Sequence, residues 1–344
     1  LSTMPATVHN NELASNPSTG DVHAEFQALV SGCGIYDLSS RAKVQLRGTD
    51  RVRWLNGMVT NNVRDLAVGH GVYAFLLNPQ GRILGDLYAY TRGDSICLDT
   101  DQTQVTKILE IFDHYIIMDD VEVENASPKL AAIGISGPKS LDVLNAAGIE
   151  AVDLQPLELR DLEWRQISLT LVHREREKRE SYEIWLAPEN TAKLWDALVQ
   201  SGALPTSKAA LELYRIALGI PHYGQDIRER DLPQETEQVR ALNFSKGCYV
   251  GQEIVERIRS RGAVHRTFTG FVFEGDLPVV GAKIQANGKD VGEITSAASL
   301  PVNGGERTVA LGYIRRDAGA PGNQVLVGEG KATIAELPFK IIFG

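Results

Sequence analysis

The sequence predicts an α+β protein that ends in a small β-barrel or sandwich. Short apolar or alternating runs, bounded by Gly, Asn, Asp and Pro, interleave irregularly with helical stretches, which favours α+β over a doubly wound sheet. From Thr267 onward, closely spaced glycines punctuate short β runs, which is typical of a separate β domain at residues 267–344. With 344 residues, 43% of them hydrophobic, the chain is long enough to bury the cores of two or three domains.

The N-terminal part of the chain alternates between strand and helix signals. Residues 1–20 are rich in Ser, Thr, Asn and Pro, which predicts a disordered tail. Asp50 is placed to cap a helix that reaches Met58, and residues 103–112 carry apolar side chains on one helical face. Strand signals occupy residues 44–46, 72–77, 83–90 and 96–98.

A second unit begins near residue 128. Its signals are a strand at 130–135, a helix at 141–147 and hairpin arms at 167–172 and 181–186. Between the arms, residues 173–180 alternate basic and acidic side chains. Because the opposite signs nearly cancel, this segment favours a solvated surface loop over a patch that binds nucleic acid.

Composition argues against several classes of protein. The chain has 44 acidic and 35 basic residues, a net charge of −9, so we expect no stable nucleic-acid binding. It contains no apolar run of membrane-spanning length and no signal-peptide pattern, so we expect no membrane association and a cytoplasmic location. Cys33, Cys97 and Cys248 are too widely and irregularly spaced for a disulfide framework or a metal site, and no metal is expected.

The octapeptide 246–253, Lys-Gly-Cys-Tyr-Val-Gly-Gln-Glu, places Cys248 between two glycines at the start of a helix. Apolar residues with helical spacing follow, so residues 251–253 form the expected first turn, where free N–H groups favour an anion. Lys246 and Arg257 add positive charge, and such surroundings lower the pKa of a thiol. The sequence therefore predicts a reactive cysteine. The alternative is a small, inert residue buried in a tight turn.

The octapeptide resembles the signature of the YgfZ-type folate-binding proteins, which are relatives of the glycine-cleavage T-protein aminomethyltransferases. The resemblance extends from about Val22 to the C-terminus. Supporting segments are residues 34–39, 58–62, 73–86, 215–227 and 291–296. The resemblance implies two related α+β subdomains within residues 21–266 and a C-terminal β-barrel, arranged around a central channel that holds tetrahydrofolate or a one-carbon derivative of it.

Residues 78–87 correspond to a T-protein segment that carries two adjacent aspartates. In this chain Gly85 replaces one of them and Asp86 keeps the other. The resemblance implies that Asp86 acts as a general acid or base beside the folate, because a carboxylate there could move a proton during one-carbon transfer. The alternative is an aspartate at a strand edge that accepts hydrogen bonds from a turn.

A second departure from the T-protein is Ala217, which stands where the resemblance implies a glutamate that pairs with the pteridine ring. Gln234 or Glu235 could substitute in part, since an amide or carboxylate oxygen also accepts ring N–H groups. Met58 and Tyr73 are otherwise typical core residues. The residues implied near the folate are Met58, Asn61, Tyr73, Arg215, Tyr223, Gln234, Glu235, Tyr249, Gln252 and Arg257.

A basic stretch lies between residues 257 and 266. It consists of Arg257, Arg259, Arg261, His265 and Arg266. Arginine binds carboxylates in forked geometry, so the glutamyl tail of a folate is one expected ligand. An RNA or protein partner and ordinary surface charge are the alternatives.

Two functions from different classes fit the resemblance. The first is a folate-binding accessory protein that maintains iron–sulfur enzymes, and thereby a tRNA modification, with Cys248 and Lys246 as working residues and iron–sulfur client or assembly proteins as partners. The second is an aminomethyltransferase that uses Asp86. The octapeptide and the loss of the glutamate at Ala217 favour the first. A scaffold that binds no folate is a third reading. Whether Cys248 meets Cys33 or Cys97 depends on distances that the sequence does not contain.

Overall fold

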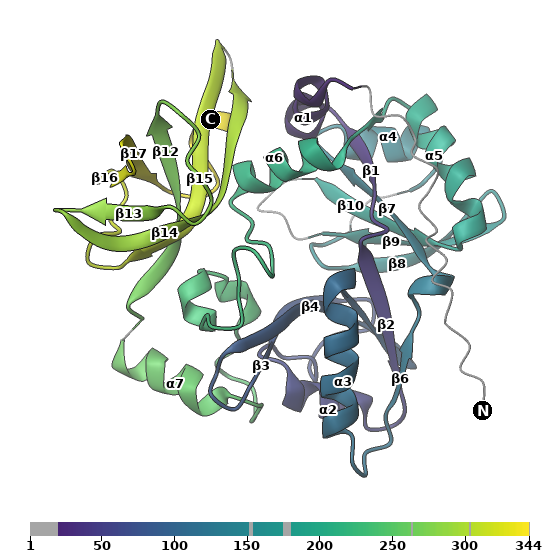
Figure 1. Cartoon of the computed structure of the whole chain (residues 1–344). Coiled ribbons are helices and arrows are strands. Elements are labelled where there is room, and N and C mark those ends of the chain that lie inside the picture. The colour runs from purple at the N-terminus through teal and green to yellow at the C-terminus, as the bar shows by residue number, and fades with distance from the viewer. Residues whose placement is uncertain (1–19, 151–153, 175–179, 263, 303, 344) are drawn as a thin grey trace, which may run out of the picture.

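The computed structural model describes residues 20–150, 154–174, 180–262, 264–302 and 304–343. These residues form a first sheet, a second sheet and a closed barrel around the centre of the molecule (Figure 1). The predicted α+β class and C-terminal barrel are confirmed. The expected tail lies, apart from Gly20, outside the described residues. In the described ranges, no helix combines the length and the apolar character needed to span a bilayer.

The first sheet has the strand order β3-β4-β5-β2-β6 and is antiparallel. Its strands are β2 (Arg41–Arg47), β3 (Gly71–Leu77), β4 (Ile83–Arg92), β5 (Ser95–Asp101) and β6 (Glu122–Asn125). Helices α2 (Arg51–Met58) and α3 (Val105–Tyr115) cover one face, where Leu87, Ala89 and Leu98 are buried. Because side chains alternate along a strand, the residues between these point to the opposite face.

Helix α2 begins where it was predicted, but the side chain of Asp50 does not cap it. The Asp50 carboxylate instead accepts hydrogen bonds from the backbone N of Asp120 at 3.0 Å and from Nε of Arg53 at 3.3 Å. The loop that contains Asp120 packs against this end of the helix, and its donor competes with the N–H groups of the first turn.

The second sheet has the order β11-β1-β7-β10-β9-β8. Its strands are β1 (Gly34–Asp37), β7 (Ala131–Ser136), β8 (Leu159–Trp164), β9 (Ile167–His173), β10 (Ser181–Leu186) and β11 (Leu204–Pro205). Helices α4 (Ser140–Ala146) and α5 (Thr191–Gln200) pack against it through residues such as Leu144 and Leu198. The first strand, β1, pairs with β7 of the second sheet. After β1 the chain leaves the second sheet to form the first sheet, and it returns to the second sheet near residue 130.

The predicted hairpin is confirmed, because β9 and β10 pair along their length. The loop between them is not wholly a solvated surface, however. Arg174 is buried, with its guanidinium 3.7 Å above the ring of Tyr88, whereas residues 175–179 lie outside the described residues. The prediction failed at Arg174 because its partners come from another sheet, and charge alternation along the chain carries no information about them.

The barrel closes in the order β12-β15-β14-β13-β16-β17. Its strands are β12 (Arg266–Glu274), β13 (Lys283–Ala286), β14 (Lys289–Val302), β15 (Gly305–Arg315), β16 (Gln324–Val327) and β17 (Gly330–Ala335). Helices α1 (Val22–Ser31) and α6 (Lys208–Leu218) join it to the second sheet, since Phe26, Tyr214 and Leu300 belong to one buried cluster. The interdomain contact is therefore an apolar core.

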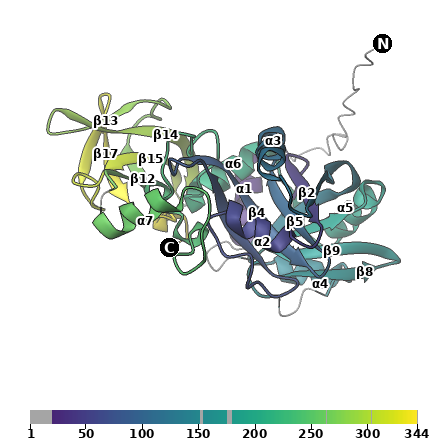
Figure 2. The ribbon, with the colours of Figure 1, turned by 90° about the horizontal axis from the view of Figure 1, so that it is seen from below.

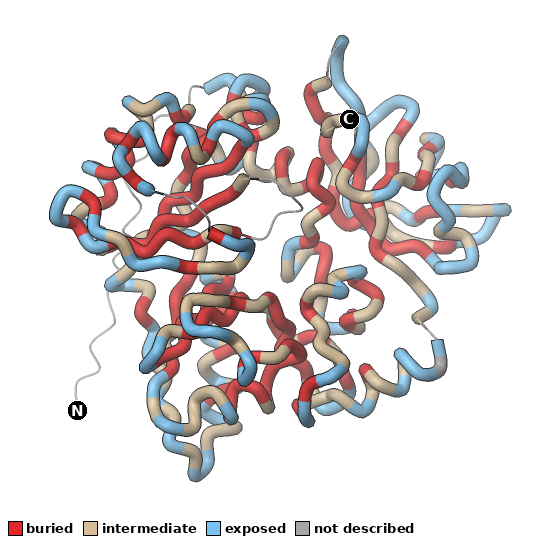
Figure 3. Tube along the Cα trace, turned by 180° about the vertical axis from the view of Figure 1, so that it is seen from behind, coloured by how far each residue is buried: buried red, intermediate tan, exposed pale blue. Residues whose placement is uncertain are grey.

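The segment between α6 and the barrel crosses the centre of the molecule and includes α7 (Gln252–Arg261). The remaining short elements are η1 (Gln102–Gln104), η2 (Ser127–Lys129), η3 (Pro188–Asn190), η4 (Pro233–Thr236), η5 (Val239–Ala241) and α8 (Lys340–Phe343). A central cluster unites Tyr90 of the first sheet, Trp185 of the second and Tyr249 of the segment. Seen from below, the barrel and α7 lie at one end of the molecule (Figure 2), and the strands are the most deeply buried parts (Figure 3).

Candidate functional site

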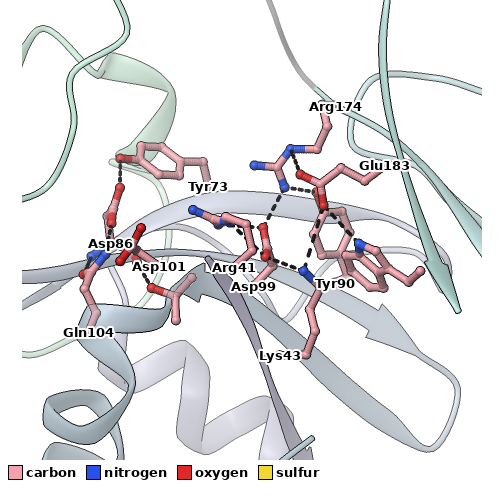
Figure 4. Close-up of polar contacts among 12 residues, drawn as sticks. Arg41, Lys43, Tyr73, Asp86, Tyr90, Asp99, Asp101, Gln104, Arg174 and Glu183 are labelled. Carbon is pink, nitrogen blue, oxygen red and sulfur yellow. Dashed lines mark hydrogen bonds and ion pairs between the residues drawn. The ribbon is translucent and has the colours of Figure 1, made fainter. Parts of the chain in front are cut away.

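The face of the first sheet opposite α2 and α3 carries polar and aromatic side chains. Along β4, Asp86, Tyr88 and Tyr90 alternate with the apolar residues that pack against the helices. The strand register places Asp99 of β5 opposite Tyr88 and Cys97 opposite Tyr90. Two polar clusters result on this face, one around Asp86 and one around Asp99 (Figure 4).

Asp86 is held by two side chains that donate to its carboxylate. The hydroxyl of Tyr73 donates to Oδ2 at 2.6 Å, and Nε2 of Gln104 donates to Oδ1 at 2.7 Å. Burial, together with the charge of Asp86, raises the pKa of Tyr73 well above its usual range, so the phenol keeps its proton. A Cβ built at Gly85 would lie 3.0 Å from Oε1 of Gln104. The place beside Asp86 is thus filled by a glutamine, and Asp86 is the acidic residue of segment 78–87.

Tyr73 is fixed from its other sides by Asn61 and Arg240. The Arg240 guanidinium lies 4.7 Å from the Tyr73 ring centre. Nδ2 of Asn61 donates to the backbone oxygens of Tyr73 at 2.8 Å and Arg240 at 2.7 Å. Asn61 therefore ties strand β3 to the central segment, which is the positioning role that a buried amide with satisfied donors performs.

The second cluster is a buried ion network that joins the two sheets. Asp99 accepts from Arg41 at 2.6 Å, Lys43 at 2.7 Å and Arg174 at 2.9 Å, and Arg174 also pairs with Glu183 at 3.2 Å. Burial by itself would raise the pKa of Asp99, but the surrounding cations outweigh it and hold that pKa far below its usual range. The carboxylate is the hub of the contact between the sheets.

Lys246 is directed away from solvent and into a cage of backbone oxygens. Its ammonium donates to the carbonyls of Asn56 at 2.5 Å, Val59 at 2.6 Å and Asn61 at 2.7 Å. The first two carbonyls lie at the C-terminal end of α2, which attracts a cation. Burial lowers the pKa of Lys246 to about 7. The geometry assigns Lys246 an anchoring role, and its predicted part as a charge that activates Cys248 finds no support in these contacts.

Cys248 is exposed, so the alternative of a small buried residue in a turn is wrong. The predicted helix follows it, since α7 begins at Gln252. Arg257, the second cation expected to act on the thiol, pairs with Glu253 at 2.7 Å on the exposed surface of that helix. The prediction that Cys248 reacts stays a prediction, but its accessibility meets the first requirement for it.

The octapeptide is anchored on both sides of Cys248. After the cysteine, the backbone N of Val250 donates to the oxygen of Gly57 at 3.1 Å. Gly251 has φ 83°, and a Cβ there would lie 2.6 Å from the backbone oxygen of Asn78. Only glycine fits this left-handed conformation and close approach. The thiol is therefore presented on a loop that is fixed at both ends.

Several residues implied near the folate are engaged in structural contacts. Met58 and Tyr249 belong to buried clusters, and Gln252 begins α7. Arg215 donates to Asp226 and also reaches Ser296 of the barrel at 2.9 Å. The hydroxyl of Tyr223 donates to the backbone oxygen of Leu84, which lies in β4 of the first sheet. Contact of these residues with a folate stays a prediction.

The proposed substitutes for the missing glutamate differ from each other. Ala217 is fully buried in α6. Glu235 is engaged with Arg266 of the basic stretch, whose Nη2 donates to it at 3.0 Å. Gln234 donates to the oxygen of Val255, but its Oε1 is buried and has no partner among the described residues. Gln234 is consequently the residue with an acceptor to offer. Within the same stretch, Arg259 pairs with Glu256.

The other two thiols are structural. Cys33 and Cys97 are buried, and burial raises the pKa of each to about 11. All three cysteines, which lie within the described ranges, are free, so Cys248 is paired with neither. In the same ranges, no group of three or more His, Cys, Asp or Glu side chains is arranged to hold a metal.

Sequence reasoning missed the residues that hold the site together. Gln104, Asp99, Arg174 and Arg240 were not among the predicted site residues. A signal existed for Asp99, because it directly follows the apolar run 96–98 in a strand, residues 95–101, whose two faces are both buried. A buried acidic residue of this kind requires cationic partners.

Comparison with known proteins identifies the class. The structure resembles that of the glycine cleavage system aminomethyltransferase T from Bartonella henselae, with a TM-score of 0.82 over 92% of this chain and 89% of the other, at 21% sequence identity. This likeness shows that the chain has the aminomethyltransferase fold.

Sequence similarity defines the family. Residues 4–246 match the GCVT N-terminal domain model, so the chain belongs to the GCVT, or glycine-cleavage T-protein, family. Aminomethyltransferases from Halothermothrix orenii and Thermus thermophilus are each 26% identical to it. The alignments cover 92% of this chain in both cases, and 90% and 89% of the respective relatives.

Proposed function

We propose that this protein is a folate-binding accessory protein of the YgfZ type, which uses Cys248 in the maintenance of iron–sulfur enzymes and thereby in tRNA modification. The observation that carries the proposal is the exposed thiol on a loop fixed at both ends by Lys246 and Gly251. A mobile or buried cysteine would not need such anchoring. A free, exposed thiol also supports a reducing compartment such as the cytoplasm.

The residues present provide some of the groups that would hold a reduced folate, but not all of them. Asp86 offers a positioned carboxylate, and the unpartnered Oε1 of Gln234 offers an acceptor for a ring N–H. Ala217 offers neither, so we expect weaker binding than a site with a glutamate would give. Bound tetrahydrofolate would supply a carrier for a one-carbon unit. Iron–sulfur client or assembly proteins are the proposed partners.

The protein's own residues would then act in separate roles. Asp86 holds or moves a proton, and Tyr73 and Gln104 fix the direction of its carboxylate. Asn61 links the Lys246 anchor to the strand of Tyr73, because it accepts from the lysine and donates to the tyrosine's backbone. Cys248 provides the thiolate for exchange with a client.

The test is rescue of iron–sulfur enzyme activity in cells that lack the protein. Cys248→Ser should abolish rescue without changing the thermal unfolding of the purified protein, because the side chain is exposed. Ser245→Ala is the matched control, since Ser245 is an exposed neighbour in the same loop. Full rescue by Cys248→Ser would rule out a role for the thiol. Equilibrium titration with 5-formyltetrahydrofolate tests the folate site separately, and no saturation at millimolar ligand would remove it.

A second candidate function is aminomethyl transfer to tetrahydrofolate. It is favoured by the positioned Asp86 and by similarity to aminomethyltransferases along most of their length. If it holds, the protein should turn over a lipoyl-bound aminomethyl group, and Asp86→Asn should lower kcat by about 10² to 10⁴, the usual scale for a general acid or base. No turnover by the parent protein would eliminate this candidate.

A further inference from the structure

The loop between α3 and β6 carries the two most exposed large apolar side chains of the described residues. Ile117 is 83% exposed and Met118 is 94% exposed. The loop projects beyond the C-terminal end of α3, at the bottom of Figure 1. We call these two residues the apolar tip. Neither belongs to the buried clusters of the first sheet, so the apolar surface of the tip is available to a partner.

The apolar tip is fixed on both sides by α2 and the residues before it. On the N-terminal side, Nε1 of Trp54 donates to the backbone oxygen of Tyr115 at 3.3 Å. On the C-terminal side, the backbone N and the hydroxyl of Thr49 donate to Oδ2 of Asp120 at 2.8 and 2.7 Å. The backbone N of Asp120 donates in turn to Asp50 at 3.0 Å. A tip held in this way loses little conformational entropy when a partner covers it, which favours binding.

The chain around the apolar tip is acidic. Residues 110–124 contain six carboxylates and no lysine or arginine. Among the described residues, salt bridges reach two of the six. Arg53 pairs with Asp119, and Lys129 pairs with Glu124.

The remaining cations in these elements do not neutralise the other carboxylates. Arg47 of β2 lies opposite Glu122 in the strand register, and Arg51 donates to two backbone oxygens. Even when both are counted with the two cations above against the six carboxylates, two carboxylates remain in excess, and Asp50 adds a third. Lys107 of α3 is already paired with the central segment. The surface around the apolar tip is therefore negative, which favours a positively charged partner.

The cysteine loop is mounted on the other end of the same helix. Lys246 donates to the carbonyls of Asn56 and Val59, and the backbone N of Val250 donates to the oxygen of Gly57. Because α2 has 8 residues, its two ends lie roughly 12 Å apart. A standard interface covers about 800 Å² on each partner, which corresponds to a patch roughly 30 Å across. One partner is therefore large enough to cover both ends of α2.

We propose that the apolar tip anchors a protein partner whose binding surface is an apolar pocket bordered by Lys and Arg side chains, and that the same partner reaches Cys248. The second part rests on the function proposed above, because it makes the partner the iron–sulfur protein that meets the thiol. Ile117 and Met118 fill the pocket, and the surrounding carboxylates pair with its rim. The same negative charge repels phosphate groups, which argues against an anionic membrane or a nucleic acid as the occupant.

The experiment is photo-crosslinking in cells, with p-benzoylphenylalanine placed at Met118, at Gly247 or at Val279 of the full chain. Gly247 adjoins Cys248, and a Cβ there meets no atom within 4 Å. Val279, 77% exposed on the loop before β13, is the control for apolar exposure alone. We expect adducts with one and the same protein from positions 118 and 247, and no adduct with that protein from position 279.

Charge reversal separates this partner from incidental capture. Glu110→Lys/Asp113→Lys changes two exposed carboxylates of α3 that form no ion pair with the described residues, so the variant should fold. It should lower the yield of the adduct at position 118 by roughly fivefold or more, because attraction to a basic rim becomes repulsion. Asp142→Lys/Glu150→Lys makes the same change at exposed positions in and after α4, and it should leave the yield unchanged.

Several outcomes would overturn the role of the apolar tip. They are no adduct at position 118, an adduct there with a second copy of this chain, different proteins at positions 118 and 247, or an unchanged yield in the charge-reversed variant. Failure of the proposed function looks different. Full rescue by Cys248→Ser would remove the role of the thiol while the adducts at both positions persist. Rescue that depends on Cys248, without an adduct at position 118, would remove the role of the apolar tip alone.

Discussion

Lys246 donates a hydrogen bond to the backbone oxygen of Asn61 at 2.7 Å, although the two residues are 185 positions apart. Both were expected at the functional site as groups that touch the ligand or the thiol. The contact shows that they form a support, in which Lys246 fixes the cysteine loop to the end of α2 and Asn61 connects it to the strand of Tyr73. Contact of Asn61 with a folate stays a prediction.

Replacing Lys246 should free the cysteine loop. In Lys246→Met three buried carbonyls lose their donor, so we expect the free energy of unfolding to fall by about 2 to 4 kcal/mol. Alkylation of Cys248 by iodoacetamide should also change in rate, because the loop loses one of its two anchors. Lys129→Met, which alters an exposed lysine, should have neither effect. An unchanged stability in Lys246→Met would contradict the anchoring role.

The depressed pKa of Lys246 makes stability depend on pH. Its pKa is about 7 in the folded protein and 10.5 in the unfolded chain, so unfolding takes up a proton between these values. The contribution of Lys246 to the free energy of unfolding therefore rises as the pH increases from 7 to 10.5, by at most about 1.4 kcal/mol per pH unit. It is lost again as the pH falls to 7. Urea unfolding at pH 6 to 9 should show this rise in the parent protein but not in Lys246→Met. Parallel plots of the free energy of unfolding against pH for the two proteins would refute this role of Lys246.

Asp99→Asn should destabilise the contact between the sheets. The substitution leaves Arg41, Lys43 and Arg174 without their shared carboxylate, and uncompensated buried charge typically costs about 3 to 5 kcal/mol. Asp196→Asn, at an exposed position of α5, serves as the control. Thermal unfolding of the two variants measures the difference. Equal melting temperatures would show that the network is not the hub described above.

Gly251→Ala should disturb the second anchor of the cysteine loop. A methyl group there would approach the Asn78 oxygen to 2.6 Å in a left-handed conformation, so we expect a loss of about 1 to 3 kcal/mol. Gly247→Ala is a matched control in the same octapeptide, because a Cβ at Gly247 meets no atom within 4 Å. Denaturant unfolding of both variants tests the contrast, and a similar loss in the two would argue against a specific requirement at Gly251.

The parts of this fold that were predictable are the local ones. The hairpin at 167–186, the helix after the octapeptide and the C-terminal barrel follow from strand alternation, helical spacing and glycine punctuation, which the chain carries within a few residues. The position of β1 was not predictable in this way, because its pairing with β7 joins segments about 100 residues apart.

By itself the sequence determined the α+β class, the barrel, the octapeptide around Cys248 and the resemblance that led to the T-protein family. Only the tertiary structure decided which charges meet. Arg174 looked like surface charge and is a buried partner of Asp99, 75 residues away, whereas Lys246 looked like a neighbour of the thiol and is bound to the end of α2. The reason is physical. Alternation and spacing report which side of an element a residue faces, but the free energy of a buried charge is set by partners that only folding brings within a few ångströms.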